Sequence, residues 1–337
     1  MHNSYKLAPI AFFALISSAI AQVPLPSTLV IQVENYVEYF EDTSDPFKKG
    51  TDPNITTVNA PLLNTFLDSD HFADIISING QPAKGLLYGS GRVIGSATTL
   101  TPGHPIADVT TSTYRTYYFQ LQNGDGMAIG TIISSGPASQ PPPGAVSGVT
   151  AGDFVILGGT GAFLGARGQA GFRNNGSGFV SGRLASASED PSRRRINGGG
   201  KRTLILSIYP SVYPQILISN GLPAVTHASD FTLVTASKPA AGGEILAAFA
   251  TGLGPTRPGV EPGLPFPQSP LAVVSSPVQI TVGGKSAEIL SAVGYPGATY
   301  GYQVNFRMPE GVAKGNAEVL ISSAWIGGAA PVLIPVQ

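Results

Sequence analysis

No segment of this chain carries the apolar periodicity of a long amphipathic helix, and this absence restricts the fold more than any motif does. The reason lies in the 42 glycines and 29 prolines, which interrupt the apolar stretches and favour turns. Between them, short stretches rich in β-branched and aromatic residues alternate apolar with polar positions. We therefore predict an all-β protein built from short strands.

The first 21 residues indicate an export signal. Lys6 supplies a positive charge, Leu7 to Ile20 form an apolar run, and Ala19-Ile20-Ala21 gives the small-residue pattern of a cleavage site. The apolar run is shorter than the ~20 residues that a membrane-spanning helix needs. We therefore predict a secreted protein, extracellular or periplasmic, that does not insert into a membrane.

Charge and cysteine content narrow the partners further. The formal net charge is −1, so no overall positive field attracts nucleic acid, and we expect no nucleic-acid partner. The chain contains no cysteine, so its domains must be stable through their hydrophobic cores without disulfide bonds. A chain of 337 residues with 42% hydrophobic residues is expected to form two such domains.

The first half of the chain is predicted to consist of strands. Thr28 to Asp42 alternates around β-branched residues, and Thr203 to Tyr209 forms a further strand. Thr113 to Gly136 is typical of two strands joined at Asn123-Gly124-Asp125-Gly126, a strong hairpin signal. Pro61 to Leu67 is expected to form a short helix, because proline is tolerated in a first helical turn.

A glycine-rich stretch, Gly158 to Gly168 (GGTGAFLGARG), follows one predicted strand. A dinucleotide-binding loop needs G-x-G-x-x-G at the start of a helix, whereas Leu164 stands here in place of the third glycine. The residues that follow are interrupted by glycine and have no helical pattern. We therefore expect no cofactor, and we interpret the glycines as residues that allow a tight turn between bent strands.

The same stretch resembles the G-G-T-G-x-F-x-x-A-R-G signature of plant dirigent proteins and is similar to the G-G-S-G-x-F-x-G-x-x-G stretch of allene oxide cyclases. Upstream, Tyr117 to Ile132 (YYFQLQNGDGMAIGTI) resembles the aromatic strand, turn and following strand of those families. The resemblance implies that residues 22–209 form an eight-stranded antiparallel allene-oxide-cyclase-like barrel around an apolar cavity. It also implies a homo-oligomer, a trimer in the resembled families.

Residues 215–337 carry a second pattern of short, half-buried strands separated by turns. Three stretches resemble the Ig-like C-terminal domain of many secreted soil-bacterial proteins: Gly243 to Thr256, Val278 to Ala292 and Gly301 to Val319. We therefore expect an Ig-like β-sandwich, joined to the barrel by a linker over residues 210–214.

Arg167 is the first candidate site residue. By resemblance it matches the arginine of the dirigent A-R-G motif, which lies at the cavity and is implicated in binding reactive intermediates. A guanidinium there can hold an enolate, phenolate or carboxylate oxygen, whereas the alternative is a structural arginine paired with a carboxylate. Tyr117, Tyr118 and Phe119 are the candidate ligand-binding residues of the apolar wall.

The first strand carries the remaining candidates, because both resembled families place a functional acid there. The options are Glu34 and Glu38, with Asn35 on the opposite parity. If the apolar parity faces inward, Asn35 lines the cavity and both glutamates are solvated, and binary patterning favours this arrangement. If the parity is reversed, Glu34 or Glu38 is a desolvated acid with a raised pKa, suited to proton transfer.

No metal site is expected, since metal binding needs several converging ligands. The three histidines after the export signal are far apart and lie on predicted loops: His71, His104 and His227. The acids nearest to His71 are predicted to share a solvated loop with it: Asp68, Asp70 and Asp74.

One basic run, Arg193 to Arg195 with Lys201 and Arg202, lies in a predicted polar loop over residues 189–202. It is either a patch for acidic polysaccharide or a solvated loop, and the weakness of isolated surface charges favours the loop.

Together these features predict a secreted barrel that binds a lipophilic small molecule and guides its cyclisation or coupling without a cofactor, with Arg167 and Glu34 or Glu38 as the catalytic candidates. Two alternatives remain open. One is a non-catalytic extracellular carrier, and the other is an adhesive or structural protein whose barrel is packed with side chains.

Overall fold

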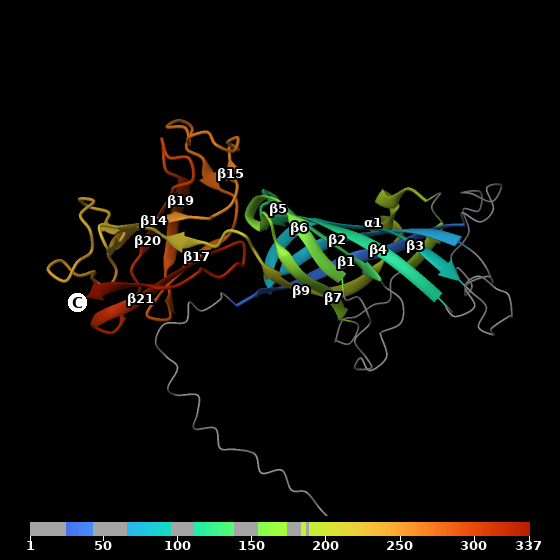
Figure 1. Ribbon diagram of the computed structural model, residues 1–337, viewed down its shortest axis with the longest axis horizontal. Helices are drawn as coiled ribbons and strands as arrows, with labels where there is room; N and C mark the ends of the chain where they lie inside the picture. The colour runs from blue at the N-terminus through green and yellow to red at the C-terminus, as the bar shows by residue number, and fades with distance from the viewer. Residues whose placement is uncertain (1–24, 43–65, 96–110, 138–153, 174–182, 187–188) are drawn as a thin grey trace, which may run out of the picture.

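The computed structural model describes residues 25–42, 66–95, 111–137, 154–173, 183–186 and 189–337 (Figure 1). The predicted export signal, His104 and residues 61–65 of the expected short helix lie outside the described residues. The last two residues of that expected helix, Phe66 and Leu67, begin a strand instead. In the part of the chain that the structure describes, no helix could cross a membrane, because none is long and apolar enough.

The first unit is a closed antiparallel barrel of eight strands, as predicted. The strands that form the ring are β1 (Ser27–Asp42), β2 (Phe66–Ile78), β3 (Gln81–Gly95), β4 (Thr111–Asn123), β5 (Ala128–Pro137), β6 (Phe154–Gly159), β7 (Arg167–Arg173) and β9 (Gly200–Tyr209). Each pairs with the next, and β1 closes the ring by pairing with both β2 and β9. A short strand, β8 (Arg183–Ser186), runs parallel to the end of β1 beyond its pairing with β9.

The glycine-rich stretch connects β6 to β7. It contains a single 3-10 turn, η2 (Gly161–Phe163), and then leads into a strand rather than a helix. Gly161 and Gly165 have φ angles of 61° and 67°, which favour glycine. The tight turn expected from the glycines is thus confirmed, and Phe163 packs fully buried into the barrel core.

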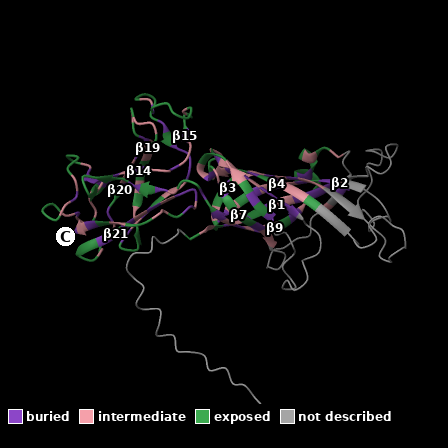
Figure 2. Cartoon of the chain, viewed as in Figure 1, coloured by how far each residue is buried: buried purple, intermediate pink, exposed green. Residues whose placement is uncertain are grey.

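Apolar side chains fill the half of the barrel nearest the second unit. Figure 2 marks buried residues in purple along the barrel strands. These inward residues are at most 1% exposed and include Leu29, Ile31, Val33, Phe119, Leu121, Ile129, Ile156, Leu206 and Ile208. They occupy alternate positions along their strands, because successive side chains of a strand point to opposite faces.

The second unit closes this end of the barrel with a turn. Ala324 and Ile326 are 0% and 1% exposed and belong to the same buried cluster as the barrel strands. Trp325 packs against that cluster, and its Nε1 donates a hydrogen bond to Gln81 Oε1 at 3.1 Å. Ala324 and Trp325 have φ angles of 51° and 62°, a conformation that costs a residue other than glycine about 1–2 kcal/mol. The packing of Ala324, Trp325 and Ile326 against the barrel therefore has to offset the free-energy cost of this strained turn.

The second unit itself consists of β-sheets that share one hydrophobic core. The larger sheet contains β10 (Gln215–Ile216), β13 (Val225–His227), β14 (Ile245–Thr251), β15 (Thr256–Arg257), β16 (Val273–Val274), β19 (Glu288–Gly294) and β20 (Tyr302–Arg307). The smaller sheet contains β17 (Val278–Val282), β18 (Lys285–Ser286), β21 (Gly315–Ser323) and β22 (Val332–Val336), and β11 (Ile218–Ser219) pairs only with β12 (Leu222–Pro223). Residues 210–214 connect the units without regular structure, and Tyr213 among them packs against the barrel core.

The segment predicted as a solvated polar loop, residues 189–202, is folded onto the barrel. It contains the 3-10 turn η3 (Pro191–Arg193), the short helix α1 (Arg194–Asn197) and the start of β9. Arg194 is only 4% exposed, so the prediction of a solvated loop is wrong here. Ion pairs to the barrel, described below, account for the difference.

Candidate functional site

Polar and charged side chains gather inside the barrel in the half farther from the second unit. We call this group the interior polar cluster, and its members are Tyr36 and Glu38 on β1, Ser69 and His71 on β2, Arg115 and Tyr117 on β4, Ser134 on β5 and Arg202 on β9. His71 and Ser134 are fully buried, and Tyr36, Ser69 and Tyr117 are at most 1% exposed.

A one-residue bulge in β1 brings Glu38 into this cluster. Between Glu34 and Val37, three residue steps on β1 match two on β2, and the same shift occurs opposite β9. Asn35 lies at the bulge with a φ angle of 53°. Because one extra residue reverses which face each later side chain occupies, the apolar parity faces inward up to Val33 and the opposite parity faces inward from Tyr36 onward.

Each parity of the first strand therefore faces inward on one side of the bulge, and the favoured arrangement, with Asn35 lining the cavity and both glutamates solvated, is wrong. Glu38 is the desolvated acid of the second arrangement, at 8% exposure. Asn35 does not line the interior, since its Nδ2 donates to Asp74 Oδ2 at 3.0 Å on the outer face. Glu34 is half-buried beside the bulge and does not join the cluster.

Glycine at position 89 makes room for the cluster. A Cβ atom at Gly89 would lie 2.5 Å from two ring carbons of Tyr117 and 3.2 Å from the Cβ of His71. These separations are shorter than side-chain contacts allow, so any other residue on β3 at this point would displace the tyrosine ring.

A chain of short polar contacts runs through the cluster. The hydroxyl of Tyr36 lies 2.6 Å from His71 Nδ1, and His71 Nε2 lies 3.4 Å from both Glu38 Oε1 and Ser69 Oγ. The Arg115 guanidinium forms an ion pair and hydrogen bond with Glu38. A neutral imidazole has one donor and one acceptor nitrogen, so His71 can accept a hydrogen bond from Tyr36 at Nδ1 and donate one toward Glu38 or Ser69 at Nε2.

Burial shifts the proton affinities in this cluster. It raises the pKa of Glu38, although Arg115 and Arg202 act in the opposite direction. Burial lowers the pKa of His71 well below its usual value, and the same two guanidinium groups lower it further. Burial also raises the pKa of Tyr36 and of Tyr117, so both phenols are neutral at physiological pH.

Several buried donors in the cluster have no hydrogen-bond partner in the part of the chain that the structure describes. Four polar side-chain atoms make no hydrogen bond of good geometry among the described residues: Arg115 Nε, Tyr117 Oη, Ser134 Oγ and Arg202 Nε. Of these, Tyr117 Oη interacts weakly with the Arg115 and Tyr36 side chains. Ring contacts link two of these residues, Arg202 and Tyr117. The Arg202 guanidinium carbon lies 4.1 Å from the Tyr36 ring centroid and 5.6 Å from the Phe172 ring centroid. The Phe172 and Tyr117 ring centroids lie 5.2 Å apart. Buried polar groups are normally satisfied, so donors without partners among the described residues mark this place as one that can bind further acceptors.

The charges of the cluster do not balance. Arg115 and Arg202 bring two positive charges, whereas Glu38 brings one negative charge and His71 is neutral. The environment therefore complements a ligand oxygen that carries negative charge, such as a carboxylate, an enolate or a phenolate.

Arg167, the leading candidate from the sequence, lies elsewhere. It is exposed on the outer face of β7, and its Nη1 donates to the backbone oxygens of Leu157 at 2.5 Å and Ala166 at 2.9 Å. Strand alternation explains the difference, because the neighbouring Ala166 is fully buried and Arg167 must then face outward. The expected cavity role of Arg167 is corrected accordingly, and guanidinium groups reach the interior from Arg115 and Arg202 instead.

The three aromatic candidates on β4 also divide by alternation. Tyr117 and Phe119 are each 1% exposed and face inward, whereas Tyr118 is 39% exposed and stacks on Tyr88 on the outer face. Three consecutive residues of one strand cannot line one wall, so Tyr118 is removed from the candidate lining.

Most members of the cluster were not predicted from the sequence, although the sequence contains a signal for them. On β2, Ser69 and His71 share the parity of the buried Ala73, and on β4, Arg115 shares the parity of Tyr117 and Phe119. Polar residues in phase with a strand's apolar face are the pattern that identifies inward polar groups. The prediction that His71 lies on a solvated loop is wrong because it overlooked this alternation in β2.

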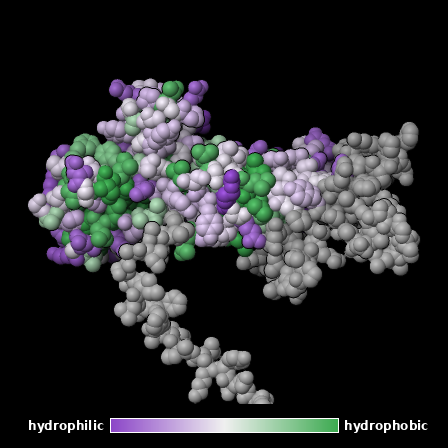
Figure 3. Space-filling view, in the orientation of Figure 1, coloured by the Kyte–Doolittle hydropathy of each residue, from purple (hydrophilic) through white to green (hydrophobic). Residues whose placement is uncertain are grey.

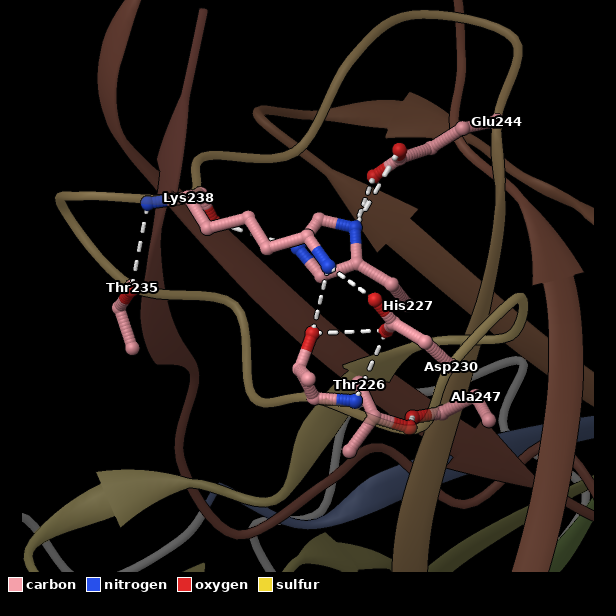
Figure 4. A network of polar contacts seen from close by, with 8 residues as sticks. Thr226, His227, Asp230, Thr235, Lys238, Glu244 and Ala247 are labelled. Atoms are coloured by element: carbon pink, nitrogen blue, oxygen red, sulfur yellow. Dashed lines mark hydrogen bonds and ion pairs between the residues drawn. The ribbon is translucent and has the colours of Figure 1, made fainter.

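A second polar network lies in the other unit (Figure 4). His227, on β13, faces Glu244 through Nδ1 at 3.2 Å and the backbone oxygen of Lys238 through Nε2 at 3.2 Å. Lys238 also forms an ion pair with Asp230, whose carboxylate accepts from Thr232. These contacts hold the loop between β13 and β14 against His227, and we therefore interpret the network as structural.

Within the described ranges, no group of three or more histidine, aspartate or glutamate side chains is placed to hold a metal ion. A scan against models of known protein families and a search of curated proteins found no match.

Proposed function

We propose that this is a secreted protein whose barrel binds a lipophilic small molecule through an acidic oxygen at the interior polar cluster. The observation that carries the proposal is the group of unpaired buried donors beside two guanidinium groups and one carboxyl group. An anionic oxygen would accept from these donors and would balance the excess positive charge. The apolar part of the ligand would pack against aromatic side chains such as Tyr117 and Phe172.

The finer fold assignments form part of this proposal. An allene-oxide-cyclase-like or dirigent-like barrel accords with the eight-stranded ring and with the turn formed by the glycine-rich stretch. An Ig-like sandwich accords with the two sheets that share one core. A homo-oligomer, a trimer by resemblance, would be the assembled form.

Glu38 is the residue proposed to act on a bound ligand. Burial raises the pKa of Glu38, so its carboxyl group binds a proton more readily than a solvated glutamate does and can exchange that proton with a bound ligand. A cyclisation needs only such proton transfer, because it rearranges atoms within one molecule. An oxidative coupling would require an oxidant from outside the protein, so cyclisation is the better fit.

A carrier without chemistry uses the same contacts and differs only in leaving the ligand unchanged. A packed structural barrel is favoured by the apolar half of the interior, where side chains fill the space. Anion binding by the polar half of the barrel distinguishes a ligand-binding barrel from a purely structural one.

The test is calorimetric titration of the full chain with laurate, an apolar chain that ends in a carboxylate, and with dodecanol as its uncharged counterpart. Arg202→Met removes one positive charge and should weaken laurate binding at least tenfold. Glu38→Gln removes the competing negative charge and should strengthen it. Arg167→Met removes an exposed guanidinium on the outer face and should leave the affinity unchanged.

Absence of laurate binding in both the natural chain and Glu38→Gln would contradict the proposal and favour the structural alternative. Binding that depends on Arg167 and not on Arg202 would place the site on the outer face. Equal affinity for laurate and dodecanol would contradict the role of the charged cluster.

A further inference from the structure

The outer face of the barrel carries a groove of about 550 Å³ that is separate from the interior. Its floor is made of cross-strand pairs on β3 and β4, with Leu86 opposite Gln120 and Lys84 opposite Gln122. Its wall is formed by Pro191, Arg194 and Arg195, which belong to η3 and to the start of α1, the helix that Figure 1 labels beside the barrel. In Figure 3 the surface at that place is strongly hydrophilic.

The wall is fixed to the barrel by one carboxylate. Asp74 on β2 accepts from Arg194 Nη2 at 2.6 Å, from Arg195 Nε at 2.9 Å and from Arg195 Nη2 at 2.7 Å. Burial alone would raise the pKa of Asp74, but hydrogen bonds from Arg195, Asn35 and Arg194 outweigh it and hold the pKa below its usual value. The anchor therefore stays charged and holds the wall against the barrel.

A second ion pair holds Glu189, which precedes this wall segment in the chain. Arg183 on β8 donates to both carboxylate oxygens of Glu189, at 2.8 Å and 2.5 Å. Paired contacts of this kind fix the orientation of both groups. The segment that carries the wall is thus held at both ends.

The lining of the groove is rich in unused hydrogen-bonding groups. The Lys84 ammonium and the Gln120 and Gln122 amides make no side-chain hydrogen bond or ion pair with described residues. The buried Arg194 also keeps its Nε without a partner, and the Arg195 side chain is 59% exposed despite its pair with Asp74. Three cations against one carboxylate leave the lining with an excess of positive charge.

An aromatic row borders the same groove. Phe72 lines it, Tyr88 lies 5.0 Å from Phe72 between ring centroids, and Tyr118 lies 5.7 Å from Tyr88. Row and floor belong to three adjacent strands, so the surface combines apolar rings, amides and cations within one face of the sheet.

We propose that this groove binds an acidic saccharide. The carboxylate of a uronic acid unit would face Lys84 and Arg195, because the lining offers uncompensated positive charge there. Its hydroxyl groups would bind Gln120 and Gln122, since each amide has both donors and an acceptor. The apolar ring face of a neighbouring unit would pack against the aromatic row. The net charge of the chain is −1, so the attraction is local to the groove and is not a property of the whole surface.

The experiment is calorimetric titration of the full chain at low salt with trigalacturonate and with its fully methyl-esterified form, which keeps the hydroxyls and removes the charges. We expect binding of the acidic form only. Lys84→Ala and Gln122→Ala should each weaken it at least fivefold. Lys314→Ala, which removes an exposed lysine of the second unit, is the matched control and should leave the affinity unchanged.

Lys84 and Lys314 are exposed and Gln122 is half-buried, and equal melting temperatures would show that each variant is folded. No binding of trigalacturonate at millimolar concentration would overturn the proposal. Equal losses for Lys84→Ala and Lys314→Ala, or tighter binding of inorganic polyphosphate that does not depend on Gln122, would also overturn it, because attraction by charge alone would then account for the result. None of these outcomes depends on whether the barrel interior binds laurate.

Discussion

The two halves of the barrel interior are built from the same strands and differ in how their side chains are satisfied. Near the second unit, the buried side chains of the interior are apolar, and the inserted Ile326 completes their packing. A few residues further along the strands, Glu38, His71 and Arg115 face inward, and donors remain unpaired. An unpaired buried donor costs about 1–3 kcal/mol, so the second half contains features that stability alone would not retain.

The boundary between the halves is local. On β1 it is the bulge at Asn35, which lies between the inward Val33 and the inward Tyr36. One half therefore resembles an ordinary protein core, while the other has the composition of a binding site. The predictions below test this division from its largest expected effect to its smallest.

Phe119→Ala tests the apolar half. Phe119 is 1% exposed in the barrel core, and removing its ring should destabilise the protein by about 3–5 kcal/mol. Chemical denaturation measures the change in the free energy of unfolding. Tyr118→Ala, at the adjacent outward position, is the control and should cost about 1 kcal/mol. Equal losses at both positions would contradict the assignment of inner and outer faces.

Ile326→Ala tests the shared core. The residue belongs to the second unit, but its side chain packs among barrel residues, and truncation should cost about 2–4 kcal/mol. A melt of the full chain followed through the barrel's tyrosines should shift to lower temperature. If only the second unit were destabilised, Ile326 would not contribute to the barrel.

Fragments test the domain boundary predicted from the sequence. A chain that ends near Tyr213 and one that begins near Pro214 should each fold, because each unit has its own core. The barrel fragment should melt below the barrel of the full chain, since it loses Ala324 and Ile326. Loss of cooperative melting in both fragments would show that the boundary is misplaced.

His71→Gln tests the polar half through pH. The native pKa of His71 is lowered below that of the unfolded chain, about 6.5, so only the unfolded chain gains a proton as the pH falls below that value. The free energy of unfolding of the natural protein should therefore fall by up to about 1.4 kcal/mol per pH unit on acidification because of His71, and that of the variant should not show this contribution. Glu38 acts with the opposite sign, because its raised pKa lowers stability as pH rises above about 4.5. Parallel stability curves for the two proteins between pH 7 and pH 5 would exclude a buried neutral histidine.

Most of the barrel strands could be predicted from the sequence, whereas the interior polar cluster could not, and the difference has a physical reason. Alternation and the turn signal at Asn123-Gly124 locate strands correctly, because both depend on neighbours within a few residues. The bulge at Asn35 depends on pairing with β2 and β9, which are distant in sequence. Without the bulge, neither parity of the first strand explains both Val33 and Glu38 facing inward. The motif-based choice of Arg167 failed for a related reason, since resemblance does not fix which face a side chain occupies.

Ser134→Ala should have the smallest effect and tests whether the unpaired donors are a cost to the fold. Ser134 is fully buried and its hydroxyl has no partner among the described residues. Replacing it with alanine removes the hydroxyl and almost no volume, so stability should stay within about 1 kcal/mol of the natural protein or rise. Ser323→Ala is the matched control, since that buried hydroxyl donates to Leu253 O at 2.8 Å and its loss should cost about 1–2 kcal/mol. A loss at Ser134 as large as that at Ser323 would mean that the hydroxyl is already satisfied within the fold, and the interior polar cluster would then lack one of the four donors proposed to hold a ligand. A neutral or stabilising effect, together with weaker laurate binding by the same variant, would show that the fold keeps this hydroxyl for the ligand.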